Sequence, residues 1–173
     1  MSVGKLLGVS KLHSSTSSDV DTSTLDGKTV LLYFSAHWCP PCRTFTPLLS
    51  SCYTKYHTSK NFEVVFCSWD QTDAEFSEYF KCQPWLAVNR GQVDRLAKHF
   101  KVQSIPTLIV LDGDTGEVHT TDGRQAVVKH PDFADFPWKG MAFSQGIPGG
   151  FFNMKNCAIV LMVGYVFYLK FLK

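Results

Sequence analysis

The chain has 173 residues, of which 45% are hydrophobic, 14% aromatic and 18% charged. This length suits one well-filled α/β domain with an appendage, and the high apolar content excludes a disordered chain. The formal net charge of +2 is too small, and the Lys and Arg residues are too dispersed, to indicate a surface that binds DNA or RNA.

The N-terminal segment, residues 1–18, contains Lys5 and Lys11, several Ser and Thr, and no acidic residue. This composition has two interpretations, an organellar transit peptide, or a part of the domain that forms a first hairpin or a surface lead-in. Arginine, which transit peptides usually contain, is missing from the segment. The composition therefore favours a part of the domain.

Residues 29–36 are rich in Val, Leu, Tyr and Phe and carry no charge, which predicts a central strand covered on both faces. Cys39 and Cys42 follow directly, and Pro41 suits the first turn of a helix over about 42–56. Residues 62–68 are β-branched and aromatic, which predicts a second buried strand, parallel to the first. The segment therefore predicts a βαβ unit.

The second half of the domain continues the alternation of helices and strands. Thr72, followed three residues later by Glu75, predicts a capping box at the start of a helix that ends near residue 81. We further predict a short strand or irregular segment at 85–88, a helix at 92–100, a strand at 107–111, its hairpin partner at 117–121 and a helix from 123 or 124 to 130. Phe136, Pro137 and Trp138 are expected to pack back onto the domain. The sequence thus predicts an α/β domain over residues 1–138, with a central mixed sheet flanked by helices.

The C-terminal region is different in kind. Residues 139–154 are rich in glycine and predict a linker. Residues 157–169 contain no charged residue, whereas Lys155 precedes them and Lys170 and Lys173 follow. At about 1.5 Å per residue this stretch spans roughly 20 Å, less than a hydrocarbon core of about 30 Å. A short anchor nevertheless suits a thin membrane, because the stretch has no polar face and Lys170 can extend to the membrane surface. We therefore interpret residues 155–173 as a C-terminal apolar helix that anchors the chain in a membrane, with a helix packed on the domain or on a second copy as the alternative.

Such an anchor predicts a location. An anchor near the C-terminus leaves residues 1–150 in the cytosol, and short tails with basic flanks resemble those of the mitochondrial outer membrane. This membrane is the expected location, and the endoplasmic reticulum is the alternative.

The cysteines indicate redox chemistry rather than a secreted, disulfide-stapled fold. Six are present, but only Cys39 and Cys42 form a close pair, and the N-terminus shows no long apolar signal core. At a helix start, Cys39 lies at the positive end of the helix dipole, so we expect its thiolate to be stabilised, to face solvent and to attack. Cys42 is expected to be covered and to resolve the mixed disulfide. The remaining cysteines are expected to be structural: Cys52, Cys67, Cys82 and Cys157.

A Cys-x-x-Cys pair can also be half of a zinc site. Such a site needs a second pair of Cys or His ligands at a suitable spacing, and the sequence shows none. We therefore expect no metal and no bound organic cofactor, only a redox-active Cys39–Cys42 disulfide.

A second signal is Pro106, in the run Ser104, Ile105, Pro106, Thr107 just before a predicted strand. A proline at this point can form a cis peptide in a loop that faces the Cys pair, or it can form an ordinary trans turn. Spacing alone does not decide between the two.

The surroundings of the Cys pair form a narrower pattern. Two prolines, Pro40 and Pro41, separate the cysteines after Trp38, where thioredoxins usually have Gly-Pro, and Tyr33 stands where thioredoxins have a buried acid. Further matches occur in order and spacing at residues 33–36, 68–70, 84–86 and 135–138. Over nearly all of residues 1–138 the chain therefore resembles the tryparedoxin family, the nucleoredoxin-like branch of the thioredoxin fold.

This resemblance implies a thioredoxin fold and a protein-disulfide reductase that is charged by the dithiol trypanothione. It implies peroxiredoxins, glutathione-peroxidase-type peroxidases and other disulfide substrates as partners. The substrate-binding residues that it implies are Trp38, Pro40, Pro41, Ile105, Pro106 and Arg124, and the supporting residues are Tyr33, Trp69 and Asp70. Gln71 stands where the family commonly has Glu, so a charge-based contact at that position is in doubt.

Two other functions fit the same sequence. Nucleoredoxin shares the Trp-Cys-Pro-Pro-Cys run, so the domain is alternatively a nucleoredoxin-like redox-sensing module that docks a partner protein. A membrane adaptor whose thiols are inert is the third hypothesis. Catalytic turnover separates the enzyme from both.

Overall fold

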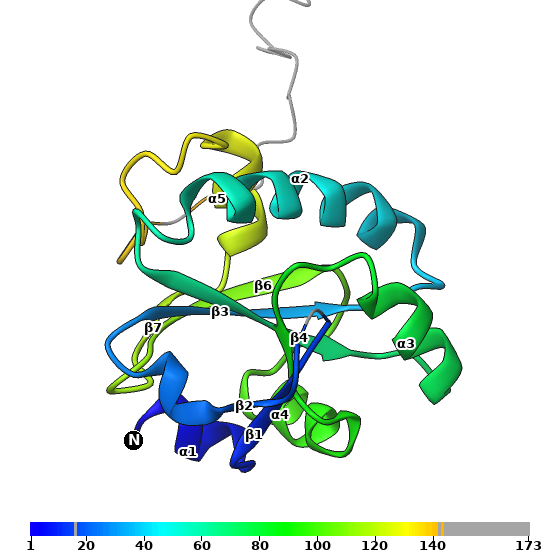
Figure 1. Ribbon diagram of the computed structural model, residues 1–173. Coiled ribbons are helices and arrows are strands. Elements are labelled where there is room, and N and C mark those ends of the chain that lie inside the picture. The colour runs from blue at the N-terminus through cyan, green and yellow to red at the C-terminus, as the bar shows by residue number, and fades with distance from the viewer. Residues whose placement is uncertain (16, 142, 144–173) are drawn as a thin grey trace, which may run out of the picture. The chain divides into compact units, whose positions relative to one another are not determined.

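A mixed β-sheet of seven strands lies at the centre of the part of the chain that the computed structural model describes, residues 1–15, 17–141 and 143 (Figure 1). The strands are β1 (Lys11–Ser14), β2 (Val20–Asp21), β3 (Thr29–Ser35), β4 (Phe62–Ser68), β5 (Leu86–Ala87), β6 (Thr107–Asp112) and β7 (Val118–Thr120). They lie in the order β2-β1-β5-β4-β3-β6-β7. Strands β3, β4 and β5 run parallel, whereas β1 and β6 are antiparallel to their neighbours. The predicted mixed sheet is confirmed.

Helices cover both faces of the sheet. On one face, the core includes side chains from α2 (Pro40–Tyr56), α3 (Asp73–Phe80) and α5 (Gly123–Lys129). On the other face, the core includes side chains from α1 (Val3–Leu7), α4 (Val93–His99) and the 3₁₀ helix η1 (Thr22–Leu25), and a second 3₁₀ turn, η2 (Arg90–Gln92), leads into α4. Figure 1 shows α2 and α5 above the sheet and α1 and α4 below it.

Strand β3 shows why the sheet is buried on both sides. Its side chains alternate, so that Leu31 and Tyr33 enter the core under α2, whereas Val30, Leu32 and Phe34 enter the core of the opposite face. All five side chains are 0% exposed. Because such a strand has no face in water, an uncharged run suits it. The predicted burial on both faces is confirmed.

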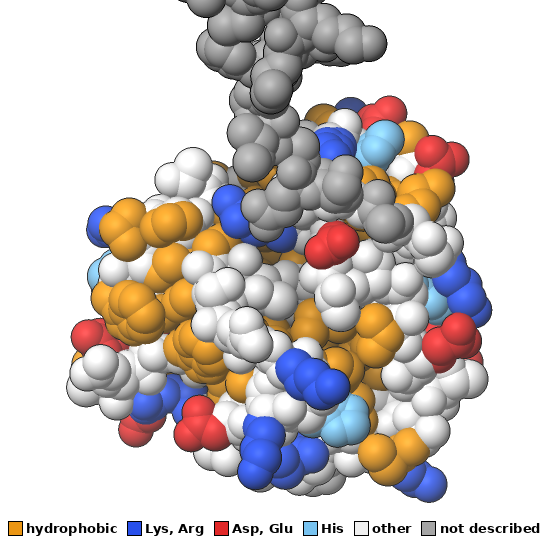
Figure 2. Space-filling view, turned by 180° about the vertical axis from the view of Figure 1, so that it is seen from behind, with side chains coloured by type: hydrophobic (Ala, Val, Ile, Leu, Met, Phe, Trp, Pro, Cys, Tyr) orange, Lys and Arg blue, Asp and Glu red, His pale blue; other side chains and the backbone are white. Residues whose placement is uncertain are grey.

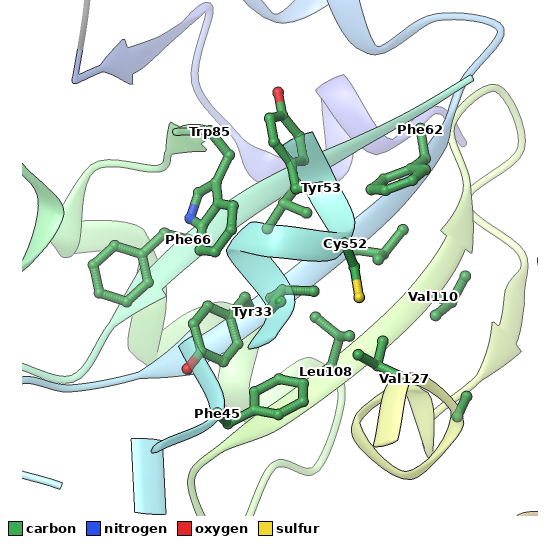
Figure 3. Close-up of a cluster of buried hydrophobic side chains, with 14 of the residues drawn as sticks. Tyr33, Phe45, Cys52, Tyr53, Phe62, Phe66, Trp85, Leu108, Val110 and Val127 are labelled. Atoms are coloured by element: carbon green, nitrogen blue, oxygen red, sulfur yellow. The ribbon is translucent and has the colours of Figure 1, made fainter. Parts of the chain in front are cut away.

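Aromatic contacts hold α2 against the sheet (Figure 3). The ring of Tyr53 in α2 meets Phe62 and Trp85 edge to face, with centroids 5.9 and 5.7 Å apart. Tyr33 of β3 meets Phe45 of α2 in the same way at 5.8 Å. Edge-to-face pairs add to the free energy gained by burial. These contacts hold α2 against the sheet.

The predicted βαβ unit and capping box are confirmed. Strands β3 and β4 pair in parallel, starting with Thr29 opposite Phe62, and α2 starts at Pro40, two residues earlier than predicted. At the start of α3 the Thr72 hydroxyl accepts from the Glu75 N–H at 3.2 Å, and the Glu75 carboxylate accepts from the Thr72 N–H at 3.0 Å. The later elements differ from their predicted bounds by a residue or two.

The N-terminal segment belongs to the core. Strands β1 and β2 form an antiparallel pair, which confirms the predicted hairpin. The sequence did not predict helix α1, whose residues Val3, Leu6 and Leu7 are 0–5% exposed. At five residues α1 is too short for a periodic pattern to reveal it, and burial in the core stabilises it instead.

The segment after α5 closes the larger core. Phe133, Phe136 and Trp138 contact one another with ring centroids 4.9–5.2 Å apart, as the predicted closing segment requires. Phe143 is 7% exposed and packs against Trp138 and His130. The compact unit therefore runs from residue 1 to residue 143, past the expected boundary at 138.

The expected apolar tail helix, residues 155–173, and most of the expected linker lie outside the described residues. Within the described ranges, every helix is too short or too polar to cross a membrane.

A buried carboxyl group, that of Glu63 in β4, gives a first testable prediction. Its Oε1 atom accepts from the Tyr53 hydroxyl at 2.8 Å and from the Val64 N–H at 3.0 Å, and Lys28 lies 3.9 Å from Oε2. Burial raises the pKa of Glu63 above its ordinary value of 4.5. The folded chain then binds this proton more tightly than the unfolded chain does, so the free energy of unfolding falls as the pH rises from about 4.5 through the raised pKa.

Urea unfolding of wild type and Glu63→Gln across this pH range measures the effect. The free energy of wild type should drop relative to the variant as the pH rises, because the amide has no proton to lose. Parallel curves for the two proteins would contradict the assignment.

Candidate active site

The two cysteines lie where strand β3 passes into helix α2. A hydrogen bond from the Cys39 N–H to the Ala36 carbonyl oxygen, 3.2 Å long, closes the turn between them. Pro40 and Pro41 occupy the first helical positions, where a missing N–H removes no helical hydrogen bond. A disulfide joins Cys39 to Cys42, and their Cα atoms are 5.2 Å apart. The sequence therefore places the predicted redox pair at a helix N-terminus.

This helix end determines the electrostatics at Cys39. Cys39 is the N-cap residue of α2, and the Cys42 N–H points to its Sγ atom at 3.3 Å. The first turn of α2 contains no acidic residue. The free N–H groups and the helix dipole thus stabilise negative charge on this sulfur once the disulfide is reduced. The geometry fits the attacking role predicted for Cys39.

Both sulfurs are more covered than the sequence indicated. Cys39 is 4% exposed and Cys42 is 0% exposed, so the expectation that Cys39 faces solvent openly is wrong, although Cys39 remains the more accessible of the two. Trp69 and Ile105 pack against the pair. Both residues are distant from Cys39 in sequence, and local patterns do not place them there.

The loop before β6 faces the Cys pair. The peptide bond between Ile105 and Pro106 is cis, and the Ile105 carbonyl oxygen lies 3.8 Å from the Cys39 Sγ atom. Pro106 is buried and Ile105 is half-buried. Of the two predicted alternatives the cis form is the one observed, and the loop brings a backbone carbonyl next to the sulfur.

Apolar side chains form a rim around the disulfide. Trp38 is 51% exposed, and Pro40 and Pro41 are exposed beside it. The Trp38 indole N–H donates to the Trp69 carbonyl oxygen at 3.2 Å, which holds the exposed ring in place. Figure 2 shows hydrophobic side chains gathered on the side of the molecule where α2 begins. The rim residues predicted from the sequence therefore lie together.

Arg124 lies in the first turn of α5. It is half-buried, and its Nε atom has no hydrogen-bond partner among the described residues. Within the described part of the chain, no hydrogen bond or ion pair joins it to the Cys pair. Its role in binding substrate stays a prediction.

Asp70 holds the turn that carries Cys39. Its carboxylate, in a residue 4% exposed, accepts from the His37 N–H at 2.7 Å and from the Ser68 hydroxyl at 2.7 Å. The Arg90 guanidinium donates to the Asp70 carbonyl oxygen at 2.7 Å. These bonds join the end of β4 to the turn before α2. Asp70 thus contacts the backbone of the turn rather than the sulfur, and its supporting role in the reaction stays a prediction.

The change Asp70→Ala is expected to lower the kcat/KM of disulfide reduction about 10-fold and the free energy of unfolding by roughly 1–3 kcal/mol, because the His37 N–H loses its acceptor. Insulin reduction with dithiothreitol and urea unfolding measure the two effects. The matched control is Asp26→Ala, at an exposed carboxylate, which should change the free energy of unfolding by less than about 0.5 kcal/mol. Equal effects of both changes would contradict the assigned role.

A group of buried hydroxyls lies under the helix start. The Thr46 hydroxyl donates to the Cys42 carbonyl oxygen at 3.0 Å, and it lies 2.7 Å from the Tyr33 hydroxyl and 2.5 Å from the Tyr79 hydroxyl. The Ser35 hydroxyl lies 3.2 Å from that of Tyr79. Because a carbonyl can only accept, the Thr46 proton points to Cys42 and both tyrosines donate to Thr46. Burial raises the pKa of the Tyr33 hydroxyl, so it stays neutral, and Tyr33 supports the site through Thr46.

Sequence reasoning missed Thr46 and Tyr79. Thr46 stands four residues after Cys42, the spacing at which a Thr hydroxyl reaches back to a helical carbonyl, so a signal was present. Tyr79 is 33 residues from Thr46, and no local pattern joins them.

The remaining cysteines divide into two kinds. Cys52 and Cys67 are free and buried, and burial raises the pKa of both thiols, which fits a structural role. Cys82 is free but exposed, which does not fit the structural role expected for it. Cys157 lies outside the described residues.

In the described ranges, no three His, Cys, Asp or Glu side chains gather as a metal site requires.

Comparison with known proteins adds a family to this geometry. A thioredoxin-like family model matches residues 27–118, which include the Cys pair and the cis-proline loop. Tryparedoxin of Trypanosoma brucei brucei is 51% identical over 127 residues, which cover 72% of this chain and 88% of that protein. The solved structure of tryparedoxin II complexed with glutathionylspermidine matches with a TM-score of 0.73 at 42% identity, over 76% of this chain and 93% of that one. The predicted thioredoxin fold is confirmed.

The nucleoredoxins match a smaller share of their own length. Nucleoredoxin of Homo sapiens is 44% identical over 123 residues, which cover 69% of this chain and 28% of nucleoredoxin. The likeness to tryparedoxin extends over most of both chains, and the region that matches the thioredoxin-like family model contains the redox-active pair at the start of α2. The chain is therefore an enzyme, a thiol-disulfide oxidoreductase, and it belongs to the tryparedoxin family.

Proposed function

We propose that the chain takes electrons from the dithiol trypanothione and passes them to disulfides of peroxiredoxins and glutathione-peroxidase-type peroxidases. The observation that carries this proposal is the Cys39–Cys42 disulfide at the start of α2, in a chain 51% identical to a tryparedoxin over 88% of that protein's length. The complex of tryparedoxin II with glutathionylspermidine supports a reductant of the trypanothione type.

The cycle has two exchange steps. The Cys39 thiolate attacks a substrate disulfide, one substrate sulfur leaves as a thiolate, and a mixed disulfide forms on Cys39. Cys42 then loses its proton and attacks the Cys39 sulfur, which releases the second substrate thiolate and forms the Cys39–Cys42 disulfide. Both released thiolates take up protons, so two electrons pass from the enzyme to the substrate. Trypanothione restores the dithiol by the same two steps in reverse.

The residues around the pair have distinct roles in this proposal. The side chains at the rim of the disulfide bind the apolar groups next to the substrate sulfur. These side chains are Trp38, Pro40, Pro41 and Ile105. Arg124 contributes a positive charge to the substrate surface. Pro106 shapes the loop that presents the Ile105 carbonyl.

A coupled assay tests the proposal. It contains NADPH, trypanothione reductase, trypanothione, a peroxiredoxin and a hydroperoxide, and NADPH oxidation is followed with and without the chain. We expect a rate that depends on the chain, that is absent with Cys39→Ser, and that falls at least about 10-fold when glutathione and its reductase replace the trypanothione pair. Equal rates with both reductants would contradict the assigned reductant.

A redox-sensing binding module is the second candidate, and the identity of 44% to nucleoredoxin favours it. Such a module would bind a partner in one redox state without turnover. An absence of peroxidase and insulin reduction above the Cys39→Ser background, together with redox-dependent binding, would select it.

We further propose that residues 155–173 anchor the enzyme in a membrane, most directly the mitochondrial outer membrane, with the endoplasmic reticulum as the alternative. The support is the sequence, since residues 157–169 carry no charge and lysines flank them on both sides.

Carbonate extraction of cells that express the full chain tests the anchor. We expect the chain in the membrane pellet and the variant Leu161→Arg in the supernatant, because a charge in the middle of a span costs about 2.5–3.5 kcal/mol on insertion. Protease protection and co-staining with markers of the two organelles give the orientation and the membrane. Full extraction of the unmodified chain would contradict the anchor.

A further inference from the structure

A groove runs along the outer side of α2, beside the redox centre but apart from its rim, since neither Trp38 nor Ile105 lines it. It has a volume of about 760 Å³, within the range of ligand sites, and His37, Tyr79 and Cys82 line it from outside the helix. The α2 residues that line the groove lie on one side of the helix: Arg43, Thr46, Pro47, Ser50, Ser51, Thr54 and Lys55.

Positive charge lines this groove at both ends. Arg43 directly follows Cys42, and Lys55 lies at the far end of the helix, while none of the lining residues is Asp or Glu. Arg43 is exposed and forms no ion pair within the described residues, so its guanidinium is available to an anion. The Lys55 Nζ atom lies 5.0 Å from the ring of Tyr56, and the Asp132 carboxylate, which does not line the groove, acts on this lysine electrostatically. The groove therefore complements a negatively charged ligand.

Pro47 adds a hydrogen-bonding position to the groove. A proline has no N–H, so the carbonyl oxygen of Arg43, four residues earlier, lacks its helical donor. Ser51 is exposed further along the same face. A backbone acceptor and hydroxyls between two cations suit a peptide, which brings both N–H groups and carboxylates.

We propose that this groove docks an extended acidic segment of the protein whose disulfide Cys39 attacks. Arg43 and Lys55 are twelve positions apart on α2, which corresponds to about 18 Å along the helix axis. An extended chain covers this length in about five or six residues, at roughly 3.3 Å each. The segment therefore carries one acidic residue next to the attacked cysteine and a second about five residues further along.

This inference rests on one part of the proposed function, namely that the disulfide substrate is a protein. The test of the inference does not use trypanothione. The probes are short peptides with one cysteine, activated as a mixed disulfide with a coloured aromatic thiol. One peptide has Glu next to the cysteine and again about five residues later, and in the other Lys replaces both. The chain is reduced with dithiothreitol, which is then removed. Cys39 attacks the peptide sulfur and releases the coloured thiolate, and Cys42 then releases the peptide thiol and forms the Cys39–Cys42 disulfide.

We expect the acidic peptide to react about 10-fold faster than the basic peptide at low salt, and the two rates to converge in about 1 M salt. The decisive variant is Lys55→Glu, which should lower this ratio about 3-fold at physiological salt. Lys55 is about 18 Å from Arg43 along α2, which is more than the Debye length of about 8 Å. A long-range electrostatic effect of Lys55 on the reaction at the disulfide therefore does not explain a fall in the ratio of the two rates. The matched control is Lys98→Glu, at an exposed lysine of α4, which should leave the ratio unchanged.

Three outcomes would overturn the docking groove. The first is that wild type reacts equally fast with the acidic and the basic peptide, and the second is that Lys98→Glu lowers the ratio of the two rates as much as Lys55→Glu does. The third is that Lys55→Glu has the same effect when the distal Glu of the peptide is moved beside its cysteine. Each leaves the proposed function intact, because that function fails only if the trypanothione assay fails. Circular dichroism of the variants separates a docking effect from unfolding.

Discussion

Replacing Cys39 with serine is expected to abolish turnover of disulfide substrates, with kcat/KM lowered by more than about a thousand-fold. Cys39 is the sulfur at the helix N-terminus, it accepts from the Cys42 N–H at 3.3 Å, and it is the more accessible of the pair. A serine hydroxyl in the same place is not ionised near neutral pH and does not attack a disulfide. Insulin reduction with dithiothreitol measures the loss.

The companion change, Cys42→Ser, should give a different result. The first exchange step still occurs, but no thiol remains to attack the Cys39 sulfur, so a substrate thiol stays attached to Cys39. Mass spectrometry after incubation with glutathione disulfide should show one added glutathione on this variant, removed by dithiothreitol.

The control for both changes is Cys67→Ala. Cys67 is 0% exposed in the core of the opposite sheet face, and burial raises the pKa of its thiol, so its loss should leave turnover within a small factor of wild type. Retention of turnover by Cys39→Ser, or a glutathione adduct on another cysteine, would contradict the assignment of the attacking sulfur.

Replacing Trp138 with alanine is expected to lower the free energy of unfolding by about 3–5 kcal/mol, the range for removing a large buried aromatic side chain. Trp138 is 0% exposed, its ring lies 5.0 Å from that of Phe133 and 4.9 Å from that of Phe136, and its indole N–H donates to the Ala134 carbonyl oxygen at 2.8 Å. The change therefore leaves a cavity and an unpaired carbonyl. Urea unfolding followed by circular dichroism measures the loss.

A second tryptophan supplies the contrast. Trp38 is 51% exposed at the rim of the disulfide, so Trp38→Ala should change the free energy of unfolding by less than about 1 kcal/mol while it lowers disulfide reduction. The pair of variants separates a residue that stabilises the fold from one that contacts substrate. Equal stability losses for the two would contradict this division.

The elements around the disulfide show what local sequence predicts well. The uncharged run over β3, the prolines at the start of α2 and the Thr72–Glu75 capping box each act within a few residues, and all three appear in the structure close to where they were predicted. The depth of the site was predicted poorly, since Cys39 is 4% exposed rather than open to solvent. The side chains that cover it, Trp69 and Ile105, come from two distant loops.

The supporting contacts of the site have the same origin. The Asp70 carboxylate accepts a hydrogen bond from the His37 N–H, 33 residues away in the sequence. Tyr79 is likewise 33 residues from Thr46, whose hydroxyl it contacts. A motif match at Asp70 indicated a supporting residue there, but neither periodicity nor capping indicated which atom it bonds. Arg124 was predicted from a motif as well, and within the described residues no hydrogen bond or ion pair joins it to the Cys pair.

The sequence by itself determined the βαβ unit and the position of the redox pair at a helix N-terminus, because these depend on hydrophobic period and on capping within a few residues. The attacking role of Cys39 stays a prediction that the helix N-terminus favours. Only the tertiary structure decided how deeply Cys39 lies, that the Ile105–Pro106 peptide is cis and faces it, and that Tyr79 and Cys82 line an open groove beside α2. These features join residues that are tens of positions apart, and packing between elements, rather than any local pattern, brings such residues into contact.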